Sequence, residues 1–153
     1  IVGQLKDGLY SGMILTYAQG MELLRRASSH YAYGLNLATV ARIWRGGCII
    51  RAALLEDIRS VFSSRPDLPN LLMNRDFAQE VMLRQDQLRA VVSTAVQMGL
   101  PVPALAASLS YFDGYRSGRL PANLVQAQRD YFGSHTYERT DAEGTFHTQW
   151  RKN

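Results

Sequence analysis

Apolar residues recur three or four positions apart in the first part of the chain. The stripe comprises Leu5, Leu9, Met13, Tyr17, Met21 and Leu24. This spacing predicts one long helix with a single apolar face. Gly12 and Gly20 lie within that helix, where a glycine costs roughly 1 kcal/mol relative to alanine. We interpret both glycines as points of close approach by another helix.

Similar stripes continue along the chain and are separated by helix stop signals. They predict a short helix over residues 37–45, a helix from Cys48 to Phe62 and a helix capped by Asn74. A further apolar stripe ends at Gly99, and two more helices are predicted over 101–118 and 121–133. Residues 63–70 contain two prolines and predict a loop. No segment combines strand alternation with hairpin turn residues. The predicted fold class is therefore all-α.

The last twenty residues differ from the rest. Residues 134–153 are polar and show no helical or strand period, yet they carry Tyr137, Phe146, His147 and Trp150. One interpretation is a frayed terminus. The other is an extended arm that docks on a second copy of the chain in a dimer. The division predicted from this contrast is a helical domain over 1–133 followed by an arm over 134–153.

Composition narrows the classes of function. A chain of 153 residues predicts one domain. The longest uncharged run lies between Arg89 and Asp113 and is broken by Pro101 and Pro103, and no other stretch approaches the roughly 20 apolar residues of a membrane span. The single cysteine, Cys48, excludes an internal disulfide and a cysteine-based zinc site. The three histidines lack a metal-binding spacing, so no metal is expected. The net charge of +4 comes from arginines that are spread along the chain. Because a nucleic-acid site needs its basic residues clustered in a patch or stripe, this distribution argues against nucleic-acid binding.

The chain begins with Ile1 and without a signal peptide. We therefore interpret it as a piece of a longer protein.

One pair of residues suggests binding chemistry. Arg129 lies near the end of the last predicted helix, and His135 follows the terminating Gly133 by two positions. A turn there could bring the imidazole to the guanidinium, and together they could hold a phosphate or carboxylate. The alternative is that Arg129 offsets the helix dipole and His135 caps a carbonyl. Asp113 and Asp130 are expected to pair with nearby arginines and need no functional role.

Several long strings resemble the decarboxylating 6-phosphogluconate dehydrogenase family. They are TYAQGMELL from Thr16, ARIWRGGCIIRA from Ala41, the run from Leu88 to Arg139 that contains RDYFGSHTYER, and FHTQW from Phe146. They occur in the family's order and cover nearly the whole chain. The resemblance identifies the chain as the later part of the family's helical domain, followed by its C-terminal arm.

This resemblance implies an NADP-dependent, cytoplasmic homodimer that oxidises 6-phosphogluconate and decarboxylates it to ribulose 5-phosphate. It further implies that the arm enters the other subunit, where Arg129 and His135 hold the substrate phosphate. The catalytic lysine and glutamate and the nucleotide-binding glycines of the family belong upstream. We therefore expect no catalytic or cofactor-binding residue in this chain, and no activity from the chain alone. The alternative is a stand-alone helical dimerisation or binding module.

Overall fold

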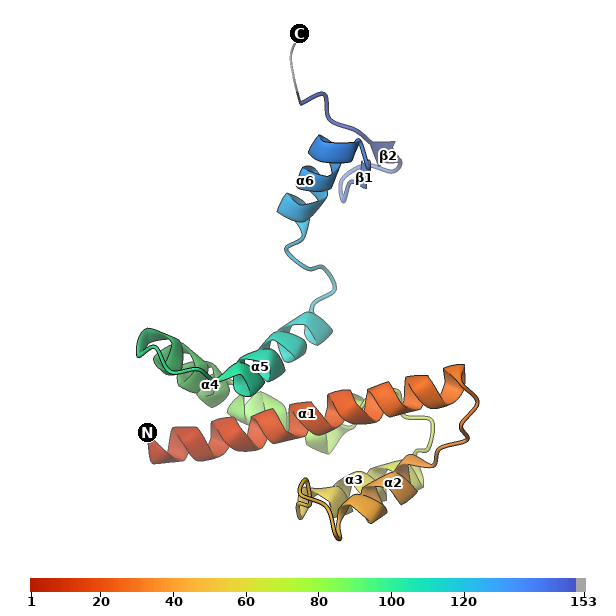
Figure 1. Cartoon of the computed structure of the whole chain (residues 1–153), viewed down its shortest axis with the longest axis vertical. Coiled ribbons are helices and arrows are strands. Elements are labelled where there is room, and N and C mark those ends of the chain that lie inside the picture. Colours follow the sequence, from red (N-terminus) through yellow and green to blue (C-terminus); the bar gives the residue numbers. More distant parts are fainter. Residues whose placement is uncertain (151–153) are drawn as a thin grey trace. The chain divides into compact units, whose positions relative to one another are not determined.

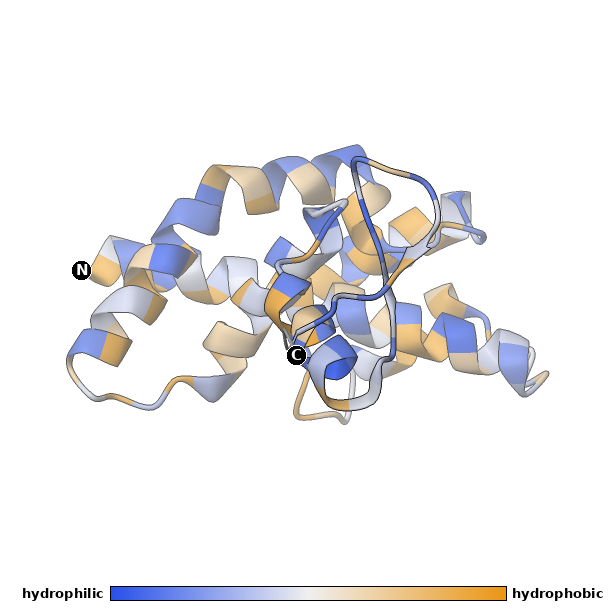
Figure 2. Cartoon of the chain, turned by 90° about the horizontal axis from the view of Figure 1, so that it is seen from above, coloured by the Kyte–Doolittle hydropathy of each residue, from blue (hydrophilic) through white to orange (hydrophobic). Residues whose placement is uncertain are grey.

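The computed structural model describes residues 1–150 and confirms a helical fold. The helices are α1 (Val2–His30), α2 (Leu37–Trp44), α3 (Leu54–Ser64), the 3₁₀ turn η1 (Leu71–Met73), α4 (Arg75–Gln97), α5 (Pro103–Arg116) and α6 (Asn123–Gly133). Two short strands follow, β1 (Tyr137–Glu138) and β2 (Thr145–Phe146). Figure 1 traces these elements along the chain. Hydrophobic and hydrophilic residues are interleaved along the helices, as in amphipathic helices generally (Figure 2).

The chain forms two compact units, residues 1–113 and 114–153. In the first unit, α1 packs along α4, and α2 packs against α3. The crossing of α1 and α4 is close because Gly8 has no side chain: a Cβ there would lie 3.2 Å from Val91 Cγ2. Gly12 likewise admits Leu105 of α5, at 2.8 Å from an added Cβ, as the sequence predicted. At Gly20 nothing lies within 4 Å of an added Cβ, so the same prediction is wrong there.

The predicted face of α1 is buried only in its second half. Met21 has no exposed surface, and Tyr17 and Leu24 pack against the core, whereas Leu5 and Leu9 are 50% and 55% exposed. Ile14, Leu15 and Ala18, which lie outside the predicted stripe, also have no exposed surface. Leu9 lines an apolar cavity of about 450 Å³ with residues of α5 and of the loop after α2. α1 is thus apolar on two faces, and α4 covers the one that contains its small residues.

Helix ends mostly follow the local signals. Asn74 accepts hydrogen bonds from the backbone N–H groups of Asp76 and Phe77, at 3.0 and 3.2 Å, and caps α4 as predicted. The expected helix start at Cys48 is wrong, because α3 begins at Leu54 and Ile49 is 99% exposed in the preceding loop.

The second unit contains α6 as well as the described part of the arm, because the residues that follow α6 fold back onto this helix. The division into a helical domain over 1–133 and an arm over 134–153 stays a prediction. The prediction of no strand is wrong within the arm: Tyr137 pairs with Phe146, and Glu138 with Thr145, in an antiparallel hairpin.

Candidate functional site

The end of α6 brings the two predicted site residues together. A guanidinium nitrogen of Arg129, Nη2, makes a hydrogen bond with Nε2 of His135. Both residues are exposed. Because a guanidinium can only donate, His135 accepts through Nε2 in this arrangement. The contact agrees with the predicted turn, while a role in binding stays a prediction.

The turn that carries His135 has an unusual backbone. Ser134 and Thr136, which flank His135, both have positive φ angles of 49° and 66°. Residues with a Cβ seldom adopt this left-handed conformation, least of all a β-branched threonine. The Ser134 N–H donates to the carbonyl of Asp130 at 2.8 Å, and the Thr136 N–H donates to Asp130 Oδ1 at 2.9 Å. Hydrogen bonds to one residue therefore hold the chain on both sides of His135.

Asp130 is the centre of this unit, although the sequence suggested no functional role for it. Its side chain has no exposed surface. Oδ1 also accepts a hydrogen bond from His147 Nδ1 at 2.8 Å, and Oδ2 accepts from the Thr148 N–H at 2.9 Å and from Trp150 Nε1 at 3.0 Å. The expected pairing of Asp130 with an arginine is wrong, since all of these partners lie in the arm.

The electrostatics of Asp130 follow from those contacts. Burial on its own would raise the pKa of this carboxyl, but the hydrogen bonds from His147, Thr148, Trp150 and Thr136 outweigh burial and hold the pKa well below its usual range. The group is therefore a carboxylate at neutral pH. By contrast, Asp113 pairs with Arg89 as expected, with Nη1 donating to Oδ2 at 2.8 Å.

Aromatic residues of the arm pack on α6 and on one another. Trp150 meets Tyr131 of α6 edge to face, with ring centroids 5.8 Å apart. Tyr137 stacks on Phe146 across the hairpin, and its hydroxyl lies 2.7 Å from Thr148 Oγ1. The described part of the arm is thus ordered on its own α6 rather than frayed.

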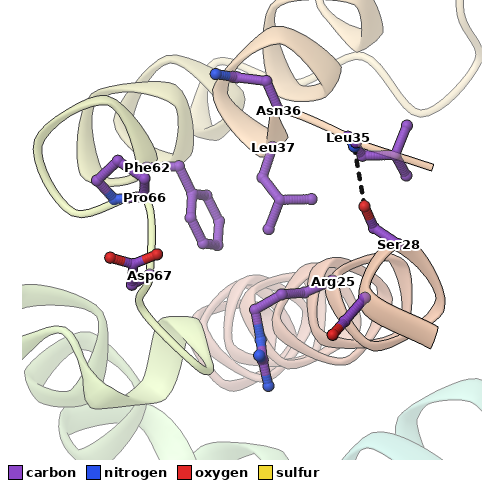
Figure 3. A pocket seen from close by; sticks show the side chains of 10 residues that line it. Arg25, Ser28, Leu35, Asn36, Leu37, Phe62, Pro66 and Asp67 are labelled. Carbon is purple, nitrogen blue, oxygen red and sulfur yellow. Dashed lines mark hydrogen bonds between the residues drawn. The ribbon is translucent and has the colours of Figure 1, made fainter. Parts of the chain in front are cut away.

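Polar groups that line a cavity of the first unit hold loops to α1. Figure 3 shows the cavity of about 540 Å³ near the end of α1, lined by Arg25, Ser28 and Asp67 among others. Arg25 Nε donates to the Pro69 carbonyl at 3.1 Å, and Ser28 Oγ accepts from the Leu35 N–H at 2.9 Å. These polar groups tie loops to α1. Within residues 1–150, no three histidine, cysteine or acidic side chains are placed to hold a metal ion.

Three comparisons relate the chain to known proteins. The family described as 6-phosphogluconate dehydrogenase, C-terminal domain, matches residues 1–150. The chain is 55% identical over 149 residues to a decarboxylating 6-phosphogluconate dehydrogenase of Synechococcus elongatus, covering 97% of this chain and 32% of that protein. It is 53% identical over 152 residues to a chloroplastic decarboxylating enzyme of rice, covering 99% and 30%.

A solved structure agrees with these relatives. The chain resembles Plasmodium falciparum 6-phosphogluconate dehydrogenase, solved in its apo form, with its cofactor NADP+ and with its substrate 6-phosphogluconate. The TM-score is 0.85 at 46% identity, over 97% of this chain and 32% of that one. The chain spans about a third of the length of these relatives. None of the helices described between residues 1 and 150 has the length and apolar character needed to cross a membrane.

Proposed function

The chain belongs to the 6-phosphogluconate dehydrogenase family, and we propose that it forms the end of the helical domain of a decarboxylating enzyme. The parent protein would oxidise 6-phosphogluconate with NADP and decarboxylate it to ribulose 5-phosphate. Its upstream part would bind NADP and carry the catalytic residues, so the chain alone is inactive. We place the parent in the cytoplasm, which cell fractionation would test.

The contact between Arg129 and His135 carries the proposed role of this chain. A phosphate monoester is a compact anion with several acceptor oxygens, and a guanidinium presents a planar set of donors to it. When an anion replaces the contact, Arg129 turns its donors to the phosphate and His135 can donate a hydrogen bond from a ring N–H to a phosphate oxygen. Both side chains are exposed, which suits a site completed by another surface.

The exposed residues of the second unit support a homodimer, in which the second subunit completes the site. Of residues 114–150, only Asp130 is buried. On α6, Leu124, Val125 and Phe132 are 81%, 55% and 76% exposed. An apolar helix face of this kind marks an interaction site. We propose that the unit docks into the partner subunit of a homodimer and delivers Arg129 and His135 to its substrate.

A chimera tests the proposed activity. The upstream part of the Synechococcus elongatus relative is joined to this chain in place of the 149 residues that match it. We expect a dimer that reduces NADP in the presence of 6-phosphogluconate. A soluble dimer without activity would contradict the proposal and favour the stand-alone dimerisation module.

Within the chimera, Arg129→Ala tests the binding role. Loss of a charge-assisted hydrogen bond costs about 1.5–3 kcal/mol, so the KM for 6-phosphogluconate should rise about tenfold or more while the dimer persists. Arg119→Ala, an exposed arginine of the same unit, is the matched control and should leave KM unchanged. An unchanged KM in Arg129→Ala would refute the assigned role.

Mixed dimers test donation across subunits. One subunit carries Arg129→Ala, and the other lacks the catalytic lysine that the family resemblance places upstream. A site that has both the catalytic lysine and the unaltered KM then forms only where an intact upstream part meets an intact Arg129 from the other subunit. We expect one such site per mixed dimer, and a mixture that shows only the raised KM of Arg129→Ala would refute donation.

A further inference from the structure

We infer that Asp130 is the positioning residue of the phosphate site, because it fixes the turn that holds His135 opposite Arg129. The inference rests on the proposed function of that pair. Asp130 follows Arg129 directly on α6, and neighbouring helix positions point in different directions. Arg129 is exposed while the Asp130 side chain is fully buried.

Asp130 controls the backbone on both sides of His135. The Ser134 N–H is bonded to its main-chain carbonyl, and the Thr136 N–H to its Oδ1. Ser134 and Thr136 hold their left-handed conformations at a free-energy cost. Without the carboxylate, Thr136 would lose its partner and could relax to a common conformation. His135 lies between these two residues, so the relaxation would move its imidazole away from Arg129.

The other contacts of the carboxylate hold the returning part of the arm. Thr148 and Trp150 donate to Oδ2, and His147 donates to Oδ1 beside Thr136. The segment with His135 and the segment after β2 are therefore fastened to a single anion that water does not reach. Buried hydrogen bonds of this kind are strong and leave little room for rearrangement.

The carboxylate remains distinct from the anion site. Among the described residues, no ion pair joins Asp130 to Arg129; its paired side chain is His147. The guanidinium thus keeps its charge available for a ligand. Asparagine at position 130 would keep one oxygen but turn an amide N–H₂ toward groups that are themselves donors, so the turn would lose part of its support.

The experiment uses the chimera with Asp130→Asn, and Asp141→Asn as the matched control. Asp141 is an exposed acid of the hairpin loop that pairs with Arg139. We expect Asp130→Asn to raise the KM for 6-phosphogluconate about tenfold, as a misplaced binding group does, with kcat and the KM for NADP nearly unchanged. Asp141→Asn should change none of these values.

A double-variant comparison separates positioning from general support of the fold. In an Arg129→Ala/His135→Ala background, Asp130→Asn should add no further increase in KM, because the groups it positions are gone. The same increase in both backgrounds, or a lower kcat at unchanged KM, would overturn the inference. If Arg129→Ala/His135→Ala itself leaves KM unchanged, the proposed function fails instead.

Trp150→Phe provides the test if Asp130→Asn does not fold. It removes one of the donors to the carboxylate and keeps the carboxylate itself. We expect a smaller rise in KM that also disappears in the Arg129→Ala/His135→Ala background. A rise that persists there would overturn the positioning role.

Discussion

At the scale of single residues, Asp130 shows how a buried charge organises a small unit. An isolated buried carboxylate is strongly disfavoured, yet this one accepts hydrogen bonds from two backbone amides, an imidazole and an indole. Because these donors favour the charged form, they lower its pKa. Folding of the second unit and ionisation of Asp130 are therefore linked.

This linkage predicts a specific pH dependence. The folded pKa of Asp130 lies below its ordinary value, so its contribution to stability is complete above that ordinary value of 3.8 and is lost as the pH falls through the folded pKa. An NMR titration of the Thr136 and Thr148 amide signals should show a midpoint well below pH 3.8. Asp130→Asn should abolish that step. A midpoint at the ordinary value would show that the hydrogen bonds to the carboxylate are weaker than described.

The site could be predicted from the sequence only in part. Gly133 and the short spacing indicated that His135 could turn back to Arg129, and the two side chains meet. The role of Asp130 left no such signal. Its partners lie 6 to 20 positions further along the chain, in a polar segment without a period. Only the folded arm brings these donors to one carboxylate.

At the scale of elements, helix ends were predicted better than helix faces. Asn74 and Gly99 act locally, through a cap and a left-handed conformation, so the sequence shows them directly. The buried face of α1 depends on which side a neighbour covers. α4 selects the side with Gly8 because a close crossing needs small residues, and a count of large apolar residues favoured the side with Leu5 and Leu9 instead.

Substitution by alanine should have opposite effects on stability at two glycines of this fold. Gly20→Ala should stabilise the chain by about 0.5–1 kcal/mol, because the added methyl meets nothing within 4 Å and alanine favours the interior of α1. Gly99→Ala should destabilise it by about 1–2 kcal/mol, because φ at Gly99 is +69°. Urea unfolding followed by circular dichroism measures both. Shifts of the same sign would contradict the described backbone.

At the scale of the whole molecule, the two units differ in how they are held together. The first has a core of buried apolar residues that includes Ile14, Leu55, Ile58 and Leu88. Residues 114–150 bury no apolar side chain and are held by the hydrogen bonds of Asp130 and by a few partly exposed aromatic contacts. Hydrogen bonds alone contribute little net stability. The second unit therefore needs a surface to dock on, which is the role proposed for the partner subunit.

This difference predicts that the second unit opens locally at a lower free energy than the first. Hydrogen exchange of the dilute, monomeric chain should show the amides of α6 at least about 100-fold less protected than those of α4, since local opening requires far less free energy where no core forms. In the dimeric chimera, protection of α6 should increase, because Leu124 and Phe132 become covered, while protection of α4 serves as the internal reference. Equal protection of α6 and α4 in the monomer would show that the second unit is stable by itself. If protection of α6 does not increase in the dimer, its apolar face lies outside the interface. That result would contradict the proposal that this face docks on the partner subunit and brings Arg129 and His135 to its substrate.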